Sequence, residues 1–264
     1  MKTALITPSL ALAAGLAAQA QLSLTQPGVP ATVNFEETVA GVGNGAFAGT
    51  GFTPTPAAGQ LDSDAWAVLG LSDGAVNFGG TVTSGDAARG ATSSPVTQGG
   101  VYAFSGGSIS GQALGFQPGG SDFDGGGTGG LYFRMVNNTG VTLDLLSVSY
   151  TGHYRNDQTR ASTVTFAWSP DNVTYTAVSS LGFSTPADAV TGAQFVSAPR
   201  SGDVGGLSIA PGEPFYFRWQ HTSTGTGSRD ELALDDLVIT AVPEPGALTL
   251  LGLGAGLLAL RRRP

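Results

Sequence analysis

The sequence predicts an all-β protein, and three of its features lead to this prediction. Glycine (41 residues) and proline (15) are frequent in the 264-residue chain, whereas charged residues make up only 11%. This balance disfavours long helices and favours short strands joined by turns. Short segments that alternate apolar and polar residues recur between clusters of Gly, Pro, Asn and Asp, as half-buried strands do. Cysteine is absent, so an apolar core has to stabilise the fold, and a chain of this length can bury one.

The N-terminal segment has the pattern of a signal peptide. Lys2 precedes an apolar run that extends to Ala18, and Ala18-Gln19-Ala20 has the small-x-small form that a signal peptidase accepts. We therefore predict a signal helix at residues 1–20 that is cleaved after Ala20. An amphipathic or buried N-terminal helix is the alternative, but the apolar run has no polar face and ends at a polar stretch with a strand-like pattern.

Strands are predicted in order along residues 21–241, which we expect to form one domain rather than two small ones. The clearest are Leu131–Val136, Val141–Tyr150, Ser162–Trp168, Val173–Val178 and Phe215–Gln220. Their period-2 alternation places Trp168 and Trp219 in the core. The turn residues Asn137–Gly140 predict a hairpin between the first two strands, and Ser169–Asn172 predicts a turn between the next two. The second half of the domain is thus expected to be a meander.

Residues 41–130 are less regular than the second half of the domain. Gly-rich runs at Gly99–Gly120 and Ser121–Gly130 are interpreted as long loops or linkers. The chain shows no internal repeat of fixed period.

The C-terminal segment, residues 242–264, combines three signals. Pro243-Glu244-Pro245 forbids helix, an apolar stretch follows from Gly246 to Leu260, and three arginines end the chain before Pro264. Fifteen apolar residues are a few short of the ~20 that span a bilayer comfortably, and flanking arginines hold such a tail in the cytoplasm. We predict a short transmembrane helix at residues 246–260.

This order of signals resembles that of PEP-CTERM proteins. In that family an exosortase removes the tail during delivery to the envelope or the extracellular matrix, so the resemblance implies Pro243, Glu244 and Pro245 as recognition residues. It also implies signal peptidase and exosortase as processing partners. The protein would be anchored transiently in the inner membrane and then delivered to the cell envelope or secreted. A plain tail anchor is the alternative, and it would leave the domain on the membrane.

A second resemblance is to the jelly-roll β-sandwich modules of secreted bacterial proteins, including carbohydrate-binding ones. It is carried by Asn34–Glu36, Asn137–Gly140, Ser149–Gly152, Phe215–Trp219 and Ser228–Leu237. The resemblance implies a jelly-roll-like antiparallel sandwich in which the first and last strands lie side by side. Carbohydrate-binding modules of this kind usually expose aromatic rings. The rings available for that role are Trp66, Tyr102, Tyr132, Tyr154 and Tyr216.

The charge of the domain limits its partners. Residues 21–241 contain 7 Lys and Arg against 18 Asp and Glu, and a polyanion such as nucleic acid needs a basic surface. Divalent cations and neutral glycans, including extracellular polysaccharide, suit this charge better.

Catalytic motifs are sparse in the sequence. His153 and His221 are the two histidines, neither lies in a motif, and we expect both in surface or loop positions. We therefore predict a non-catalytic surface or binding module. The alternative is a secreted carboxylate-dependent hydrolase of glycans or phosphoesters, which would show two inward-facing acids about 5 to 10 Å apart in a deep cleft.

A structural calcium ion is predicted where the first and last strands meet. Asp235 and Asp236 point to opposite faces of a strand, so one of them turns toward the seam, where an unpaired carboxylate is costly. A hard cation bound by Glu36 and Asp236, with Asp235 as the alternate ligand, would remove that cost. The competing interpretation is that both aspartates accept hydrogen bonds from turn amides or from Arg229.

Overall fold

The computed structural model describes residues 21–123, 129–224 and 226–243. The predicted signal helix and transmembrane helix lie outside these residues. Strands dominate the described part, which also contains two short 3-10 turns, Gly85–Ala87 and Ser179–Leu181. Across the described ranges, no helix is both long enough and apolar enough to cross a membrane.

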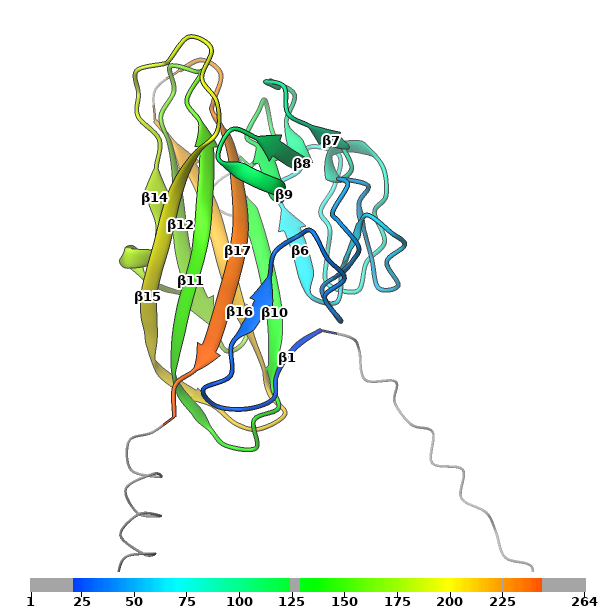
Figure 1. Cartoon of the computed structure of the whole chain (residues 1–264), viewed down its shortest axis with the longest axis vertical. Coiled ribbons are helices and arrows are strands. Elements are labelled where there is room, and N and C mark those ends of the chain that lie inside the picture. The colour runs from blue at the N-terminus through cyan, green and yellow to red at the C-terminus, as the bar shows by residue number, and fades with distance from the viewer. Residues whose placement is uncertain (1–20, 124–128, 225, 244–264) are drawn as a thin grey trace, which may run out of the picture.

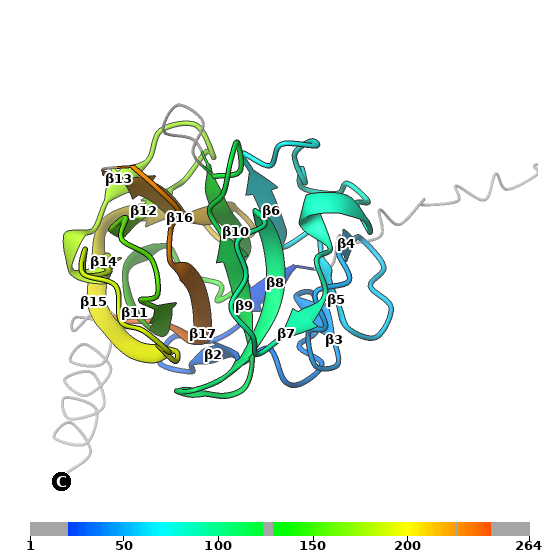
Figure 2. The same cartoon turned by 90° about the horizontal axis from the view of Figure 1, so that it is seen from above.

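Two seven-stranded sheets face each other (Figures 1 and 2). Sheet A has the spatial order β1 (Leu22–Leu24), β10 (Gly130–Asn137), β16 (Pro214–Ser223), β12 (Ser162–Ser169) and β13 (Thr176–Ala177). Two further strands join it, β14 (Phe183–Ser184) beside β12 and β6 (Trp66–Leu69) beside β10.

Sheet B has the order β15 (Val196–Ile209), β11 (Leu143–Arg155), β17 (Glu231–Ala241), β9 (Ile109–Gln117), β8 (Gly100–Gly106) and β7 (Ala91–Thr92). Its seventh strand, β2 (Ala31–Val33), pairs with β17. A small third sheet contains β3 (Gly43–Asn44), β5 (Gln60–Asp62) and β4 (Phe52–Thr53). The predicted all-β, jelly-roll-like sandwich is thus confirmed.

The core lies between the two large sheets and follows the predicted alternation. Trp219 pairs with Leu131 across β16 and β10, is 0% exposed, and has Phe166 and Tyr150 at ring-centroid distances of 5.3 and 5.7 Å. Trp168 is also buried. The prediction that both tryptophans belong to the core is confirmed, because alternate positions of a strand face one side of its sheet.

The predicted hairpin between the strands at Leu131 and Val141 is wrong. β10 belongs to sheet A and β11 to sheet B, so the turn carries the chain from one sheet to the other. Asn137 holds this crossing, because its Nδ2 donates to the carbonyl oxygens of Val141 and Ile209, both at 2.8 Å. Turn residues show where a chain reverses but not which strands pair afterwards.

The predicted meander is also wrong, because strands adjacent in sequence often lie in opposite sheets. One local pairing holds: β12 and β13 form the expected hairpin, with Ala167 opposite Ala177.

The Gly-rich run at Gly99–Gly120, interpreted as a loop or linker, instead contains the antiparallel pair β8 and β9. The Phe104 ring packs directly on the backbone of Gly115, because a Cβ at residue 115 would lie only 2.1 Å from the ring. Glycine is therefore needed here for close packing inside a strand.

The two ends of the domain meet as predicted. β2 pairs antiparallel with β17, with Val33 opposite Leu237, and Asn34–Glu36 follows β2 directly. In sheet B, β17 has β11 on one side and β2 and β9 on the other. This places the predicted calcium residues at one edge of the last strand.

Candidate functional site

The seam between the first and last strands gathers the three predicted calcium ligands. β9 pairs with β17 only from Leu232 to Leu234, and β2 only from Leu237 to Ile239. Asp235 and Asp236 lie in the interval between these partners. A bulge in β17 coincides with it, and Asp236 adopts a φ of 50°, a left-handed conformation that such bulges use.

The bulge separates the two aspartates: Asp235 is buried at 4% exposure, whereas Asp236 is exposed. The Asp236 N–H donates to Asp235 Oδ1 at 2.8 Å, as the turn-amide interpretation expects. Burial raises the pKa of Asp235 to about 7, and the charges of Asp236 and Glu36 add to the rise. Burial and Asp236 likewise raise the pKa of Glu36, against a hydrogen bond from the Gln112 backbone.

These three carboxyl groups therefore lie close enough to repel one another. Within the ranges that the structure describes, however, no group of three or more His, Asp or Glu side chains has an arrangement that could hold a metal ion. A calcium ion here would need backbone oxygens or water to complete its shell. The calcium site stays a prediction.

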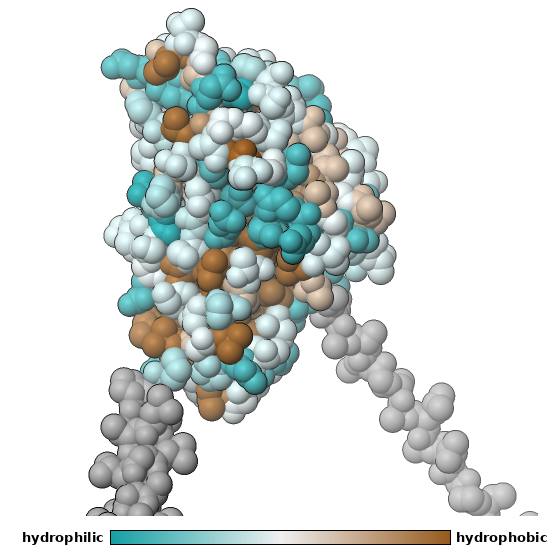
Figure 3. Space-filling view, viewed as in Figure 1, coloured by the Kyte–Doolittle hydropathy of each residue, from teal (hydrophilic) through white to brown (hydrophobic). Residues whose placement is uncertain are grey.

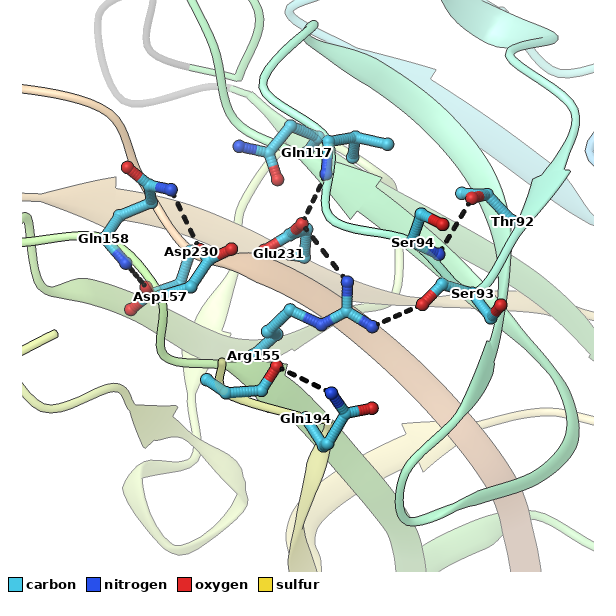
Figure 4. A network of polar contacts seen from close by, with 12 residues as sticks. Thr92, Ser93, Ser94, Gln117, Arg155, Asp157, Gln158, Gln194, Asp230 and Glu231 are labelled. Carbon is cyan, nitrogen blue, oxygen red and sulfur yellow. Dashed lines mark hydrogen bonds and ion pairs between the residues drawn. The ribbon is translucent and has the colours of Figure 1, made fainter. Parts of the chain in front are cut away.

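A second polar cluster lies on the outward face of sheet B (Figure 4). Arg155 and Glu231 oppose each other on β11 and β17, and they are 1% and 0% exposed. Their Nη1 and Oε1 atoms are 3.9 Å apart. Arg155 Nη2 donates to the Ser93 carbonyl (2.6 Å), and Glu231 Oε1 accepts the Val96 N–H (2.6 Å). The Arg155 guanidinium also lies 4.6 Å from the centre of the Phe195 ring.

This cluster is incompletely satisfied. Arg155 Nε and Glu231 Oε2 are buried with no hydrogen-bond partner among the described residues. Burial raises the pKa of Glu231 to about 7, with a further rise from the charge of Asp157. The sequence did not single out Arg155. The signal was its position on the same face of β11 as His153, where the preceding residues of that face, Ser147, Ser149 and Thr151, are small.

The expectation that both histidines occupy surface or loop positions is wrong. His153 and His221 lie in β11 and β16 and are each 2% exposed. Burial lowers the pKa of each to about 4. His153 Nδ1 is 2.9 Å from Ser108 Oγ, but its Nε2 has no hydrogen-bond partner in the described part of the chain. No third residue therefore orients the ring as in a Ser-His-acid triad.

The outward face of sheet A carries rings and guanidinium groups in alternation. Tyr132 faces Arg218 across β10 and β16, and Arg134 faces Tyr216 in the same register. Tyr175, from the turn before β13, has the Arg218 guanidinium 4.2 Å from its ring centre. Tyr175 also packs edge-on against Tyr132, with ring centroids 5.8 Å apart.

A second row continues this face. Phe78 has its ring 5.7 Å from Tyr216 and 5.1 Å from the Arg134 guanidinium. Phe78, Tyr175, Tyr216, Arg134 and Arg218 are all partly exposed. We call these five residues and Tyr132 the aromatic–arginine face. The sequence pattern identified Tyr132 and Tyr216, whereas Phe78 and Tyr175 come from loops that only the fold brings to this face.

Of the five rings expected to point outward, Tyr216 alone is partly exposed on the aromatic–arginine face. Tyr132 is buried at 5% exposure against Tyr175, and the other three rings lie elsewhere. Trp66 is 1% exposed and packs on Phe133 in the core, with centroids 4.3 Å apart, so its outward assignment is wrong. Tyr102 is buried and stacks on Phe104. Tyr154 is partly buried against the core.

The carboxylate-hydrolase alternative requires two acids that face a cleft. Three pockets of about 290, 440 and 250 Å³ are lined by residues that the structure describes, and Asp144 is the one acid among those residues. Asp86 and Asp122 are buried carboxyl groups in contact. Ser72 donates to both of them, so they are held together inside the fold rather than across a cleft.

The predicted sorting residues fall at the limit of the described chain. Pro243 is exposed and lies two residues beyond the end of β17. Glu244, Pro245 and the predicted cleavage residue Ala20 lie outside the described residues.

Comparison with known protein families identifies the C-terminal segment. Residues 241–263 match the family described as the PEP-CTERM protein-sorting motif. No curated protein matches the chain significantly.

Solved structures with a similar arrangement of strands are distant in sequence. The CBM22-1 xylan-binding domain of Xyn10C from Paenibacillus barcinonensis is 14% identical, covers 83% of this chain and 98% of its own, and has a TM-score of 0.38. The K1 adhesin domain of Lys-gingipain from Porphyromonas gingivalis W83 is 15% identical, covers 82% and 100%, and has a TM-score of 0.37. CBM28, a module specific for non-crystalline cellulose, is 10% identical, covers 52% and 78%, and has a TM-score of 0.31.

Proposed function

The chain carries a PEP-CTERM sorting motif, which implies export, transient membrane anchoring and exosortase processing, and we propose that the sandwich it delivers is a non-catalytic glycan-binding module. The proposed final location is the cell envelope or the extracellular matrix, with extracellular polysaccharide as the ligand. The observation that carries the binding proposal is the aromatic–arginine face of sheet A.

The chemistry of this face suits an extended polysaccharide. Aromatic rings offer flat apolar surfaces against which the C–H faces of sugar rings can pack. Guanidinium groups offer several N–H donors in a fixed plane for hydroxyl or carboxylate oxygens. Tyr175 packs against Arg218, and Tyr216 packs against Phe78. Because these contacts already restrict the side chains, the entropy cost of ordering them on binding is small.

A glycan array probed with the 21–243 fragment tests the binding proposal. We expect Tyr216→Ala and Tyr175→Ala to weaken binding to the captured glycan at least tenfold, equivalent to about 1.4 kcal/mol. Tyr154→Ala, in sheet B, is the matched control and should leave binding unchanged. If the two face variants lower thermal stability but bind as the wild type does, the rings only stabilise the sheet and the proposal fails.

Processing at both ends is tested by the intact mass of the protein from its native host. We expect a chain that begins at Gln21 and has lost Arg263. A mature chain that still begins at Met1 would refute the signal peptide, and one that retains Arg263 would indicate a permanent tail anchor.

We also propose that calcium binds at the seam of Glu36, Asp235 and Asp236. Burial, and in second place the charge of neighbouring carboxylates, raises the pKa values of Glu36 and Asp235, and a divalent cation would offset both costs of ionisation. Calcium should then raise the melting temperature of the 21–243 fragment relative to chelator, because a ligand of the native state stabilises it by mass action. Asp236→Asn should abolish the difference. An identical melting temperature in millimolar calcium and in chelator would leave turn hydrogen bonding as the explanation of the aspartate pair.

A further inference from the structure

The last strand leads into the sorting motif without a spacer. The motif match begins at residue 241, and Ala241 is the last residue of β17. The Gly28 N–H donates to the Ala241 carbonyl at 2.7 Å, and the Val242 N–H donates to the Leu145 carbonyl at 3.0 Å. Pro243 lies beside Gly28, with its Cγ 3.8 Å from the position of an added Cβ. The domain therefore holds the first residues of the motif.

This attachment limits how far the domain can stand from a membrane. Three residue steps separate Pro243 from Gly246, where the apolar stretch begins, and an extended chain covers at most about 10 Å in three steps. The headgroup layer on each side of a bilayer is itself roughly 5 to 8 Å thick. If the apolar stretch is in the hydrocarbon core, the end of the sandwich that carries Pro243 is at the headgroups.

An apolar patch surrounds Pro243 at this end of the sandwich, beside the exposed Glu213 of the turn between β15 and β16. We define the basal surface as Pro27–Val29, Val141–Asp144 and Val242–Pro243. It contains a pocket of about 290 Å³ between Pro27, Val141 and Pro243. Val29 and Val141 are 50% and 51% exposed, and Asp144 is the one charged residue in the set. Figure 3 shows apolar patches over the lower half of the molecule, toward the end from which β17 leaves in Figure 1.

We propose that the basal surface lies against the lipid headgroups for as long as the tail is in place, with the opposite end of the sandwich directed away from the membrane. This inference rests on the membrane anchoring that the sorting motif implies. The tail supplies the affinity, since a few valines and prolines are too small to bind a bilayer alone. The strands then stand upright on the membrane, and the aromatic–arginine face stays open to the side for a glycan.

The absence of cysteine allows a single label to report on this contact. Val141→Cys, labelled with an environment-sensitive fluorophore, is placed in the chain from residue 21 to 264 and reconstituted in phosphatidylcholine vesicles that contain a headgroup nitroxide quencher. Val190→Cys is the control, with a matched exposure of 54%. The Val190 N–H donates to the Asn156 carbonyl, beyond the far end of β11, and 13 strand residues place it about 40 Å from the basal end.

Flotation of the vesicles is measured first, because it reports on insertion of the tail. In the protein that floats, we expect the label at 141 to be quenched several-fold more than the label at 190. Val29→Cys provides a second basal position in case the 141 variant does not fold, and the fragment that ends at Pro243 should be unquenched. Equal quenching at 141 and 190 in floating protein would overturn the inference. Failure to float would overturn both anchoring and this inference, while glycan binding by the fragment would be unaffected.

Discussion

Arg155 and Glu231 form an ion pair that the fold has almost completely removed from water. The two charges lie 3.9 Å apart, and the Phe195 ring covers the guanidinium. Desolvation of such a pair costs about as much free energy as the attraction returns, but removal of one partner leaves the other charge buried and uncompensated. The pair is therefore a sensitive point of the structure even if its net contribution to stability is small.

Replacement of this arginine alone should be strongly destabilising. We expect Arg155→Ala to lower the free energy of unfolding by about 3 to 5 kcal/mol, measured by chemical denaturation of the 21–243 fragment at pH 8, above the pKa of about 7 that Glu231 has beside Arg155. The double variant Arg155→Ala with Glu231→Gln should recover part of the loss. No recovery in the double variant would mean that the arginine acts through packing on Phe195 instead of through charge.

β16 is the element around which the core is organised. Its inward residues Phe215, Phe217 and Trp219 are all fully buried, and they meet Phe166 of the neighbouring β12 and Tyr150 of the opposite sheet. Its outward residues Tyr216 and Arg218 belong to the aromatic–arginine face. One strand thus contributes residues both to the hydrophobic core and to the proposed binding surface.

Truncation of the central ring of this strand tests its role. Trp219→Ala should destabilise the domain by about 3 to 5 kcal/mol, because it leaves a cavity that the two sheets cannot close. The denaturation midpoint of the fragment measures the effect, and Trp168→Ala, at the sandwich edge with 8% exposure, should cost less. Equal midpoints for wild type and Trp219→Ala would contradict the burial of this ring.

The whole domain should be more stable in mild acid than at neutral pH. Burial raises the pKa values of Glu231 and Asp235 to about 7 and those of Asp62 and Asp230 to about 6. Groups with raised values bind protons more tightly in the native state, so stability declines as pH rises from about 4 to 7. Burial lowers the pKa values of the two histidines to about 4, so their contribution to stability increases as pH rises from 4 to 6.5. Four acids oppose these two histidines, and we expect the acids to dominate.

A melting series of the fragment from pH 5 to pH 8 measures this balance. We expect the melting temperature at pH 5.5 to exceed that at pH 7.5, and we expect Glu231→Gln to flatten the profile above pH 6. A melting temperature that rises steadily with pH over this range would show that the histidines dominate.

Much of this protein followed from local patterns. Alternation along Ser162–Trp168 and Phe215–Gln220 placed the core side chains correctly, because the two faces of a strand differ at every second residue whatever the strand pairs with. The order of proline, glutamate, apolar stretch and arginines identified the sorting motif, because that signal is read along the chain and does not depend on the fold.

Only the tertiary structure showed which strands pair and which distant side chains meet. In the folded protein β10 and β11 belong to different sheets, and Trp66 and both histidines are buried. Arg155 pairs with Glu231, 76 positions later in the sequence. Phe78 and Tyr175 lie on the same face as Tyr132 and Tyr216. Each of these features depends on contacts between segments far apart in the chain, and turn or alternation patterns do not predict such contacts. The position of Pro243 against Gly28 is of the same kind, because the sequence contains the motif but only the fold shows that it begins where the last strand ends.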